Sequence, residues 1–294
     1  MTTQQTNQQT NQQTNQQTTN PATAPLTLIL GATGKTGRRI ARALQAKGLP
    51  VRPGSRSATP AFDWTREASW DACLEGVKAI YITYAPDLAI PGAGDAIRTL
   101  VAKAERLGVE RLVLLSGRGE QEAQACERIV LASTIPSTVV RASWFNQNFS
   151  EGAFADMVHA GHITLPAGDV PEPFVDVDDI AEVALAALTQ DGHAGEIYEV
   201  TGPRALTFAE VTAELAKATG RDIRYTQIPH EAFIAGAEQS GAPKDVVWML
   251  DYLFATVLDG RNTALSDGVE RALGRKPKDF ADYARDAVQA GMWA

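Results

Sequence analysis

The chain has 294 residues, of which 44% are apolar and 21% charged, and a formal net charge of −8. This composition excludes disorder as the dominant state and allows a large buried core. The charge is unevenly distributed: residues 1–62 contain seven Lys and Arg residues and no Asp or Glu, whereas the remainder has 20 basic and 35 acidic residues. An acidic chain with one basic segment argues against a nucleic-acid partner, and it directs attention to what the basic segment binds.

Length, cysteine content and hydropathy limit the number of domains, the cellular compartment and the possibility of a membrane span. Dividing by about 150 residues per domain gives two domains, but one doubly wound α/β unit with additions also fits and is preferred. Cys73 and Cys126 cannot form a disulfide framework or a zinc cluster, so a cytoplasmic location is expected. No apolar run reaches the roughly 18 residues of a membrane span, and the N-terminus lacks a signal-peptide pattern. We expect no membrane partner and leave a homodimer open.

The first 25 residues form a low-complexity segment. The tetrapeptide Thr-Asn-Gln-Gln occurs three times, from Thr6, Thr10 and Thr14, and no large apolar side chain follows Met1. Such a segment buries too little surface to offset its ordering entropy. Residues 1–25 are therefore predicted to be a disordered tail.

Short apolar runs alternate with helical periodicities from Leu26 onward. Apolar strands that alternate with helices form parallel sheets covered on both faces, so residues 26–150 are predicted to be a doubly wound, Rossmann-type α/β domain. The expected strands are 26–30, 50–55, 79–84, 111–116 and 137–142, and the expected helices are 35–47, 67–75, 93–107 and 120–133.

Residues 151–294 are less regular and more acidic. They are expected to form a smaller, mainly helical lobe that binds the substrate, with some segments returning to the sheet. The short strands expected here are 163–165, 174–175, 196–200 and 224–228, the helices are 179–188 and 208–219, and helices dominate from 231 to 292.

A glycine-rich turn, Gly-Ala-Thr-Gly-Lys-Thr-Gly, joins the first expected strand to the first expected helix. Its first glycine permits the tight turn, the second lets the backbone approach a pyrophosphate, and the third allows the helix to pack closely. The amides at the helix N-terminus then face the phosphates, so the turn predicts an NAD(P) site. An ordinary strand-helix turn is the alternative. The residues expected to contact the cofactor are Gly31, Thr33, Gly34, Lys35, Thr36 and Gly37.

The second expected strand ends without the Asp or Glu that NAD-selective sites place there for the ribose 2′-hydroxyl. Ser55, Arg56 and Ser57 follow instead, and hydroxyls with a guanidinium suit an additional phosphate. NADP(H) is therefore expected in preference to NAD(H), with a solvated basic loop as the alternative. The remaining basic residues of this segment, Arg38, Arg39, Arg42 and Lys47, are most simply a solvated helix face.

With these motifs the chain resembles the NmrA-like branch of the atypical short-chain dehydrogenases/reductases, and most of all the ergot-alkaloid-dehydrogenase-type reductases. The likeness covers about residues 26–200 and is specific for the family, not for a substrate. The matching segments are residues 31–39, 55–57, 62–64, 114–117, 141–149 and 174–181.

The resemblance implies roles for further residues. Arg56 would meet the 2′-phosphate, and Asp63 with Trp64 would lie against the adenine, although Asp63 also fits a helix N-cap. The other positions that the resemblance implies for cofactor contact are Ser55, Tyr84, Ala85, Pro86, Ser116, Gly117 and Ser143, the last of these near the nicotinamide together with Trp144 and Phe145.

The chain departs from typical short-chain dehydrogenases in lacking Tyr-x-x-x-Lys, whose tyrosine protonates a carbonyl oxygen. The residues four places after its six tyrosines are Ala85, Leu88, Gly202, Pro229, Thr256 and Ala287. Carbonyl reduction with that dyad is thus not expected. An iminium substrate needs no general acid, and water can supply the proton to a quinone or conjugated enone.

Three residues are candidates for catalysis. Arg118 follows the fourth expected strand and could hold a substrate anion, while nearby Glu120 could stabilise a cation or transfer a proton. Trp144 and Asn148 follow the fifth strand and could sandwich and orient a flat substrate. The alternatives are a helix-entry turn for the first pair and core packing for the second. Asp176, Asp178 and Asp179 are explained by a helix N-cap, so no metal is expected.

These observations predict an NADPH-dependent oxidoreductase that transfers hydride to a small planar or heterocyclic electrophile, such as an iminium, quinone or conjugated enone. Two alternatives remain open: an NAD(P)-sensing regulatory protein without turnover, and a non-redox cyclase or dehydratase. The small-molecule substrate itself is not identified by the sequence.

Overall fold

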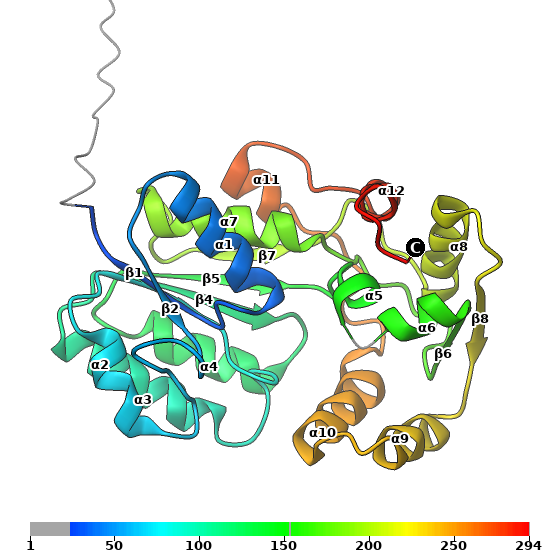
Figure 1. The fold of residues 1–294 in the computed structure, drawn as a ribbon, viewed down its shortest axis with the longest axis horizontal. Coiled ribbons are helices and arrows are strands. Elements are labelled where there is room, and N and C mark those ends of the chain that lie inside the picture. The colour runs from blue at the N-terminus through cyan, green and yellow to red at the C-terminus, as the bar shows by residue number, and fades with distance from the viewer. Residues whose placement is uncertain (1–23, 153, 294) are drawn as a thin grey trace, which may run out of the picture.

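The computed structural model describes residues 24–152 and 154–293 (Figure 1). The tail expected at 1–25 lies almost wholly outside the described residues. Within the described part of the chain, no helix combines the length and the apolarity needed to cross a membrane.

A six-stranded parallel sheet forms the centre of the molecule. Its order is β2-β1-β3-β4-β5-β7, so the strand order reverses direction next to β1. The four-residue strands β1 and β3 are buried along their whole length, which explains why they appear in the sequence as uninterrupted apolar runs. The strands are β1 (Thr27–Leu30), β2 (Val51–Gly54), β3 (Ala79–Ile82), β4 (Arg111–Gly117), β5 (Ser137–Ala142) and β7 (Ile197–Val200).

Helices cover both faces of this sheet, and the predicted doubly wound architecture is confirmed. One face packs against α2 (Trp70–Leu74), which follows a 3-10 turn at Glu67–Ser69, and against α3 (Ala93–Arg106) and α4 (Gln121–Leu131). The opposite face packs against α1 (Lys35–Ala46), α7 (Val177–Thr189) and α11 (Gly268–Leu273). The two layers lie below and above the sheet in Figure 1. The second part of the chain therefore contributes one strand, β7, to the sheet. It also contributes two helices, α7 and α11, that cover one face.

The remaining elements form a lobe beside the carboxyl ends of the strands (Figure 1). Its core is an aromatic cluster that includes Phe149, Phe208 and Phe280. The strand expected at 174–175 is wrong: Val175 forms only an isolated parallel bridge with Phe145. The elements are α5 (Asn148–Glu151), α6 (Ala155–Ala160), β6 (His162–Leu165), α8 (Phe208–Thr219), β8 (Arg224–Gln227), α9 (His230–Gln239), α10 (Lys244–Tyr252), a π-helical turn η3 (Leu253–Val257) and α12 (Phe280–Gln289).

Two arginines of α1 connect the sheet to this lobe. Arg38 and Arg39 both pair with Glu151 of α5, and Arg39 also bonds Asp178 of α7, with 2.5 Å between Nε and Oδ1. The expectation that they form a solvated helix face is therefore wrong, because both pair with carboxylates more than a hundred residues away in the sequence. Part of the basic excess of the first 62 residues is neutralised in this way.

Gly37 lets α1 begin directly against the turn that precedes it. A Cβ atom at position 37 would lie 2.3 Å from the carbonyl oxygen of Gly31, closer than any side chain can approach. Because the obstructing atom belongs to the backbone, it cannot move without distorting the turn.

We expect Gly37→Ala to lower the free energy of unfolding by about 1–3 kcal/mol, the usual cost of forcing a methyl group into a filled site. Gly236→Ala is the matched control, because that glycine lies within α9 and has open space around it. Its free energy of unfolding should stay the same or rise by up to about 1 kcal/mol. Urea denaturation of both variants measures the difference, and equal stabilities would contradict the close approach.

Candidate functional site

The carboxyl ends of β1, β3, β4 and β5 meet at one edge of the sheet. Since all four strands are parallel, the turn that follows each of them lies at this edge. The strand order reverses between β1 and β3, which leaves a crevice where open α/β sheets bind ligands. The sequence-predicted residues of the glycine-rich turn and of the turns after β3, β4 and β5 all lie along this edge.

The glycine-rich turn presents free backbone amides to the crevice. Gly31 has a φ of +66°, and the Gly34 amide donates to its carbonyl at 2.8 Å, which closes the turn. Gly34 is then the N-cap of α1, where no side chain caps the helix and no acidic residue occupies the first turn. Thr33 and Gly34 are exposed. This uncompensated positive end of the helix dipole suits an anionic pyrophosphate.

Lys35 and Thr36 occupy the first turn of α1 but face different surroundings. Lys35 is half-buried against the end of α5, and burial lowers the pKa of its ammonium group while Glu151 opposes the shift. The ammonium nitrogen would come within 2.9 Å of a Cβ atom built at Gly152. Thr36 is buried beneath the turn, and the buried Tyr81 hydroxyl has no hydrogen-bond partner among the described residues. Lys35 can therefore couple a ligand in the turn to the lobe.

The end of β2 carries an exposed cation and no carboxylate. Arg52 is committed to the fold, because its Nη1 donates to the carbonyls of Cys73 at 2.9 Å and Glu75 at 2.6 Å. Arg56 is exposed and forms no ion pair within the described residues. The hydroxyls of Ser55 and Ser57 lie 3.2 Å apart beside it. This loop therefore offers a guanidinium and two hydroxyls to an anion.

An aromatic wall stands between the ends of β2 and β3. The Trp64 indole donates to the Thr83 carbonyl at 3.2 Å, and its ring centroid lies 4.7 Å from that of Tyr84. Asp63 accepts from the amide and hydroxyl of Thr65, and these bonds hold the pKa of Asp63 below its usual value. Asp63 thus caps a turn at Trp64 and Thr65 and is not the cap of a helix. The wall provides flat apolar surface of the kind that an adenine ring stacks on.

The serines predicted to line the cofactor point in different directions. Ser116 is buried and donates from Oγ to Glu127 of α4 at 2.6 Å, so its hydroxyl turns away from the crevice. Ser143 is also buried, but its Oγ has no hydrogen-bond partner among the described residues. Gly117 ends β4 between them. Ala85 is exposed and Pro86 half-buried in the turn after β3.

Arg118 is held by the protein itself. Its Nε lies 3.2 Å from a carboxylate oxygen of Glu199 on β7, and its Nη1 donates to the Asn262 carbonyl at 2.6 Å. The Asn262 amide returns a bond of 3.0 Å to the Arg118 carbonyl, and the arginine side chain is only 9% exposed. The guanidinium therefore joins β4 to β7 and to the loop before α11, and binding a substrate anion would require these bonds to break.

Trp144 forms part of the wall between the crevice and the lobe. Its ring is half-buried and lies 5.1 Å from Phe254 and 5.5 Å from Phe208, measured between centroids. Asn148 begins α5 and is half-buried. Neighbouring Asn146 is fully buried, and neither its amide oxygen nor its nitrogen has a partner among the described residues. Of this cluster, the half-buried Trp144 and Asn148 remain accessible to a ligand.

Two carboxyl groups that sequence reasoning did not combine lie at the same edge. Asp87 follows the turn after β3, and Glu120 is the N-cap of α4 after β4. The sequence pattern singles out Glu120 but gives no reason to single out Asp87. The signal that could have paired them is that both follow adjacent parallel strands by a few residues. Burial raises the pKa of both groups, and each carboxyl group affects the pKa of the other.

The chain is similar in sequence to a known protein family. The model of the NmrA-like family matches residues 122–283. The chain is 31% identical over 277 residues to agroclavine dehydrogenase of Claviceps fusiformis. The aligned region covers 88% of this chain and 96% of that relative. The chain belongs to the NmrA-like family.

Other proteins are similar to this chain in sequence or in fold. NAD(P)H azoreductase of Xenophilus azovorans is 28% identical over 281 residues, covering 88% of this chain and 97% of that relative. The NADPH-dependent quinone oxidoreductase QOR2 of Escherichia coli, solved as its NADPH complex, has a TM-score of 0.71 at 22% identity and covers 89% of this chain and 99% of that chain. These similarities confirm the resemblance that the motifs indicate.

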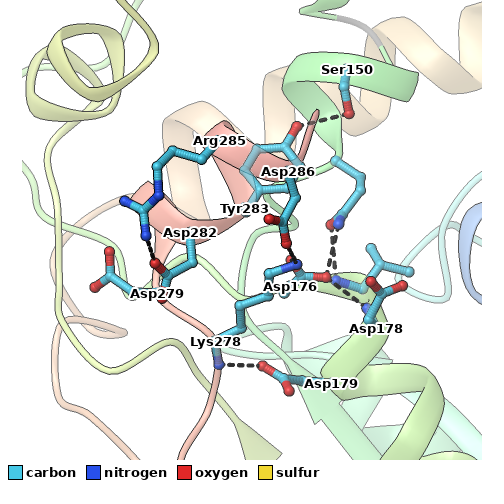
Figure 2. A network of polar contacts seen from close by, with 12 residues as sticks. Ser150, Asp176, Asp178, Asp179, Lys278, Asp279, Asp282, Tyr283, Arg285 and Asp286 are labelled. Atoms are coloured by element: carbon cyan, nitrogen blue, oxygen red, sulfur yellow. Dashed lines mark hydrogen bonds and ion pairs between the residues drawn. The ribbon is translucent and has the colours of Figure 1, made fainter. Parts of the chain in front are cut away.

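The acidic segment of this NmrA-like chain is structural. Asp176 caps α7, accepting from the Asp178 amide and from Gln147, both at 2.8 Å. Figure 2 shows the surrounding network, in which Lys278 pairs with Asp286 at 2.7 Å and its amide donates to Asp179 at 2.8 Å. The aspartates thus hold α7 against the segment leading into α12. Gln147 also bonds the Val177 amide at 2.8 Å, which fixes the segment that carries Trp144.

A further carboxyl group lies buried behind Arg118. Both oxygens of Glu172 lack partners among the described residues, and its side chain is fully buried. Burial raises the pKa of Glu172 to about 7, although nearby Arg118 opposes the shift. The carboxyl group is therefore neutral in the folded protein below about pH 7.

We expect this group to make stability depend on pH. Between about pH 4.5 and 7 the folded chain retains a proton that the unfolded chain releases, so stability falls as pH rises, by up to roughly 3 kcal/mol at about 1.4 kcal/mol per pKa unit. Glu172→Gln removes this dependence, and its stability relative to the parent should increase across that window. Thermal unfolding at several pH values measures it, and parallel curves for the two proteins would contradict the assignment.

Proposed function

We propose that this NmrA-like protein is an NAD(P)H-dependent oxidoreductase that reduces a small planar or heterocyclic electrophile, such as an iminium, quinone or conjugated enone, and prefers NADPH. The observation that carries the proposal is the uncapped start of α1 beside an exposed Arg56 at the end of β2, with no carboxylate there. The names of the relatives, which include a dehydrogenase, an azoreductase and a quinone oxidoreductase, support the same reaction class.

The residues of the crevice fit a dinucleotide along its length. The turn from Gly31 to Gly37 would hold the pyrophosphate, Arg56 with Ser55 the 2′-phosphate, and Trp64 with Tyr84 the adenine. Gly117 and the unpartnered Ser143 hydroxyl would lie near the nicotinamide. Ser116 is better placed to brace α4 through Glu127, since its hydroxyl donates there. A bound nicotinamide supplies hydride, and the protein supplies orientation and electrostatics.

The substrate would lie between the nicotinamide position and the lobe. Trp144 offers an aromatic face at this boundary, and Asn148 offers an amide, which suits a flat molecule with few polar groups. We assign Arg118 to bracing β4 and β7 in the free protein, because its Nε and Nη1 already bond Glu199 and Asn262 and its side chain is only 9% exposed. No tyrosine or lysine occurs in α4, so the usual acid of short-chain dehydrogenases has no counterpart on that helix.

The direct test is turnover with a panel of iminium, quinone and enone substrates. Purified protein with NADPH should lose absorbance at 340 nm with at least one of them, and faster with NADPH than with NADH. Binding of both oxidised and reduced cofactor without any turnover would overturn the proposal and favour a sensor. Substrate conversion without cofactor consumption would favour a cyclase or dehydratase.

Arg56 should determine the choice of cofactor. We expect Arg56→Ala to weaken NADPH binding roughly 10- to 100-fold while leaving NADH binding unchanged, because a charge-assisted bond to a phosphate contributes about 1.5–3 kcal/mol. Arg98→Ala is the matched control: that arginine is also exposed but pairs with Asp95 on α3. Fluorescence titration with both cofactors measures the effect. An equal loss for NADH would contradict a 2′-phosphate contact.

A further inference from the structure

Two acidic side chains from neighbouring turns meet at the carboxyl edge of the sheet. Asp87 follows β3, Glu120 follows β4, and these strands are adjacent in the sheet. The Asp87 carboxylate accepts the Ala89 amide at 2.8 Å, which fixes it on its own turn. A Cβ atom at Gly117 would lie 2.0–2.4 Å from the Glu120 carboxyl atoms, so this group lies directly against the backbone at the end of β4.

The contact between the two groups requires a proton. Asp87 and Glu120 lie close enough to affect each other's pKa, and two ionised carboxylates have no hydrogen to share. Glu120 is only 5% exposed, and its Oε2 has no other partner among the described residues. Two like charges at this distance cannot both persist, which is the arrangement that raises one pKa of a carboxyl pair.

The surroundings favour retention of that proton. Burial, then Asp87, and then Glu122 and Glu127 of α4 raise the pKa of Glu120 well above its usual value. The Tyr252 hydroxyl from α10 donates to Glu122 at 2.6 Å and brings no positive charge. Arg118, the nearest arginine along the chain, is directed to Glu199 and Asn262. No cation among the described residues pairs with either carboxyl group of the pair.

We propose that Asp87 and Glu120 form a proton-sharing pair that protonates the reduced substrate, in place of the tyrosine that this chain lacks. The inference rests on the proposed function and adds the acid that it leaves undefined. Asp87 is half-buried, whereas Glu120 is buried, so the proton reaches the crevice through Asp87. The Glu120 carboxyl group lies against Gly117, at the end of β4 where the proposed nicotinamide position would be.

The step balances with water as the final proton source. A quinone or enone gains a hydride at a conjugated carbon, the π electrons shift, and a negative charge develops on the carbonyl oxygen. The shared proton moves from Asp87 to that oxygen as an O–H bond forms, which leaves both carboxyl groups of the pair ionised. Repulsion within the ionised pair favours its reprotonation from water through half-exposed Asp87. An iminium carbon that gains a hydride becomes a neutral amine and needs no proton from the pair.

The shared proton can be tested without cofactor or substrate. Infrared spectra of the free protein at pH 8 should contain a protonated-carboxyl band that disappears in Glu120→Gln. Glu110→Gln, at the opposite end of β4 where its exposed side chain pairs with Lys78, should keep the band. A band of equal intensity in the parent and Glu120→Gln would overturn the pair.

The donor role is tested by comparing two substrate classes in each of two variants. Asp87→Asn and Glu120→Gln should lower kcat for a quinone or enone by roughly 100-fold or more, the usual contribution of a general acid, and leave kcat for an iminium within about twofold. Equal losses for both classes would indicate a structural role and overturn the donor. If the protein shows the infrared band but reduces no substrate, the proposed function and the donor role are both wrong. The shared proton is still supported by that result.

Discussion

The close approach between α1 and the turn before it is the constraint on which the site depends. Because Gly37 has no side chain, α1 starts against the Gly31 carbonyl and its first amides face the crevice. The same placement brings Arg38 and Arg39 to Glu151 and Asp178, which attaches the lobe to the sheet. One backbone contact therefore positions both the proposed phosphate site and the lobe on the other side of the crevice.

Charge is distributed along this edge in two distinct ways. Arg118, Arg141, Glu127 and Glu199 satisfy one another across β4, β5 and β7, so they stiffen the edge and leave little charge for a ligand. Asp87 and Glu120 have no such cation, and burial makes a shared proton the stable arrangement. Neutralised pairs and a protonated pair side by side give the crevice little net charge near its substrate end. A neutral or cationic planar substrate fits that environment better than a polyanion.

The proteins similar to this chain in sequence or fold have different names, among them an agroclavine dehydrogenase, an NAD(P)H azoreductase and a quinone oxidoreductase. The structure suggests a physical basis for such variety. The cofactor edge is built from backbone amides and glycines, which change little with substrate, whereas the lobe contributes aromatic surfaces such as Trp144 that accept many flat shapes. A proton source formed by two turns of the sheet edge, separate from the lobe, would serve any substrate that binds against Trp144.

The sequence by itself determined the sheet, the glycine-rich turn and the family, because these depend on local patterns: apolar runs for buried strands, glycines where the backbone must pass closely, and a helix immediately after. Only the tertiary structure decided what the charged residues do. Arg38, Arg39 and Arg118 face carboxylates or carbonyls from 81 to 144 residues away. Asp87 and Glu120 come together because β3 and β4 are neighbours in the sheet. A side chain's charge is visible in the sequence, but its partner is set by which strands and helices pack together.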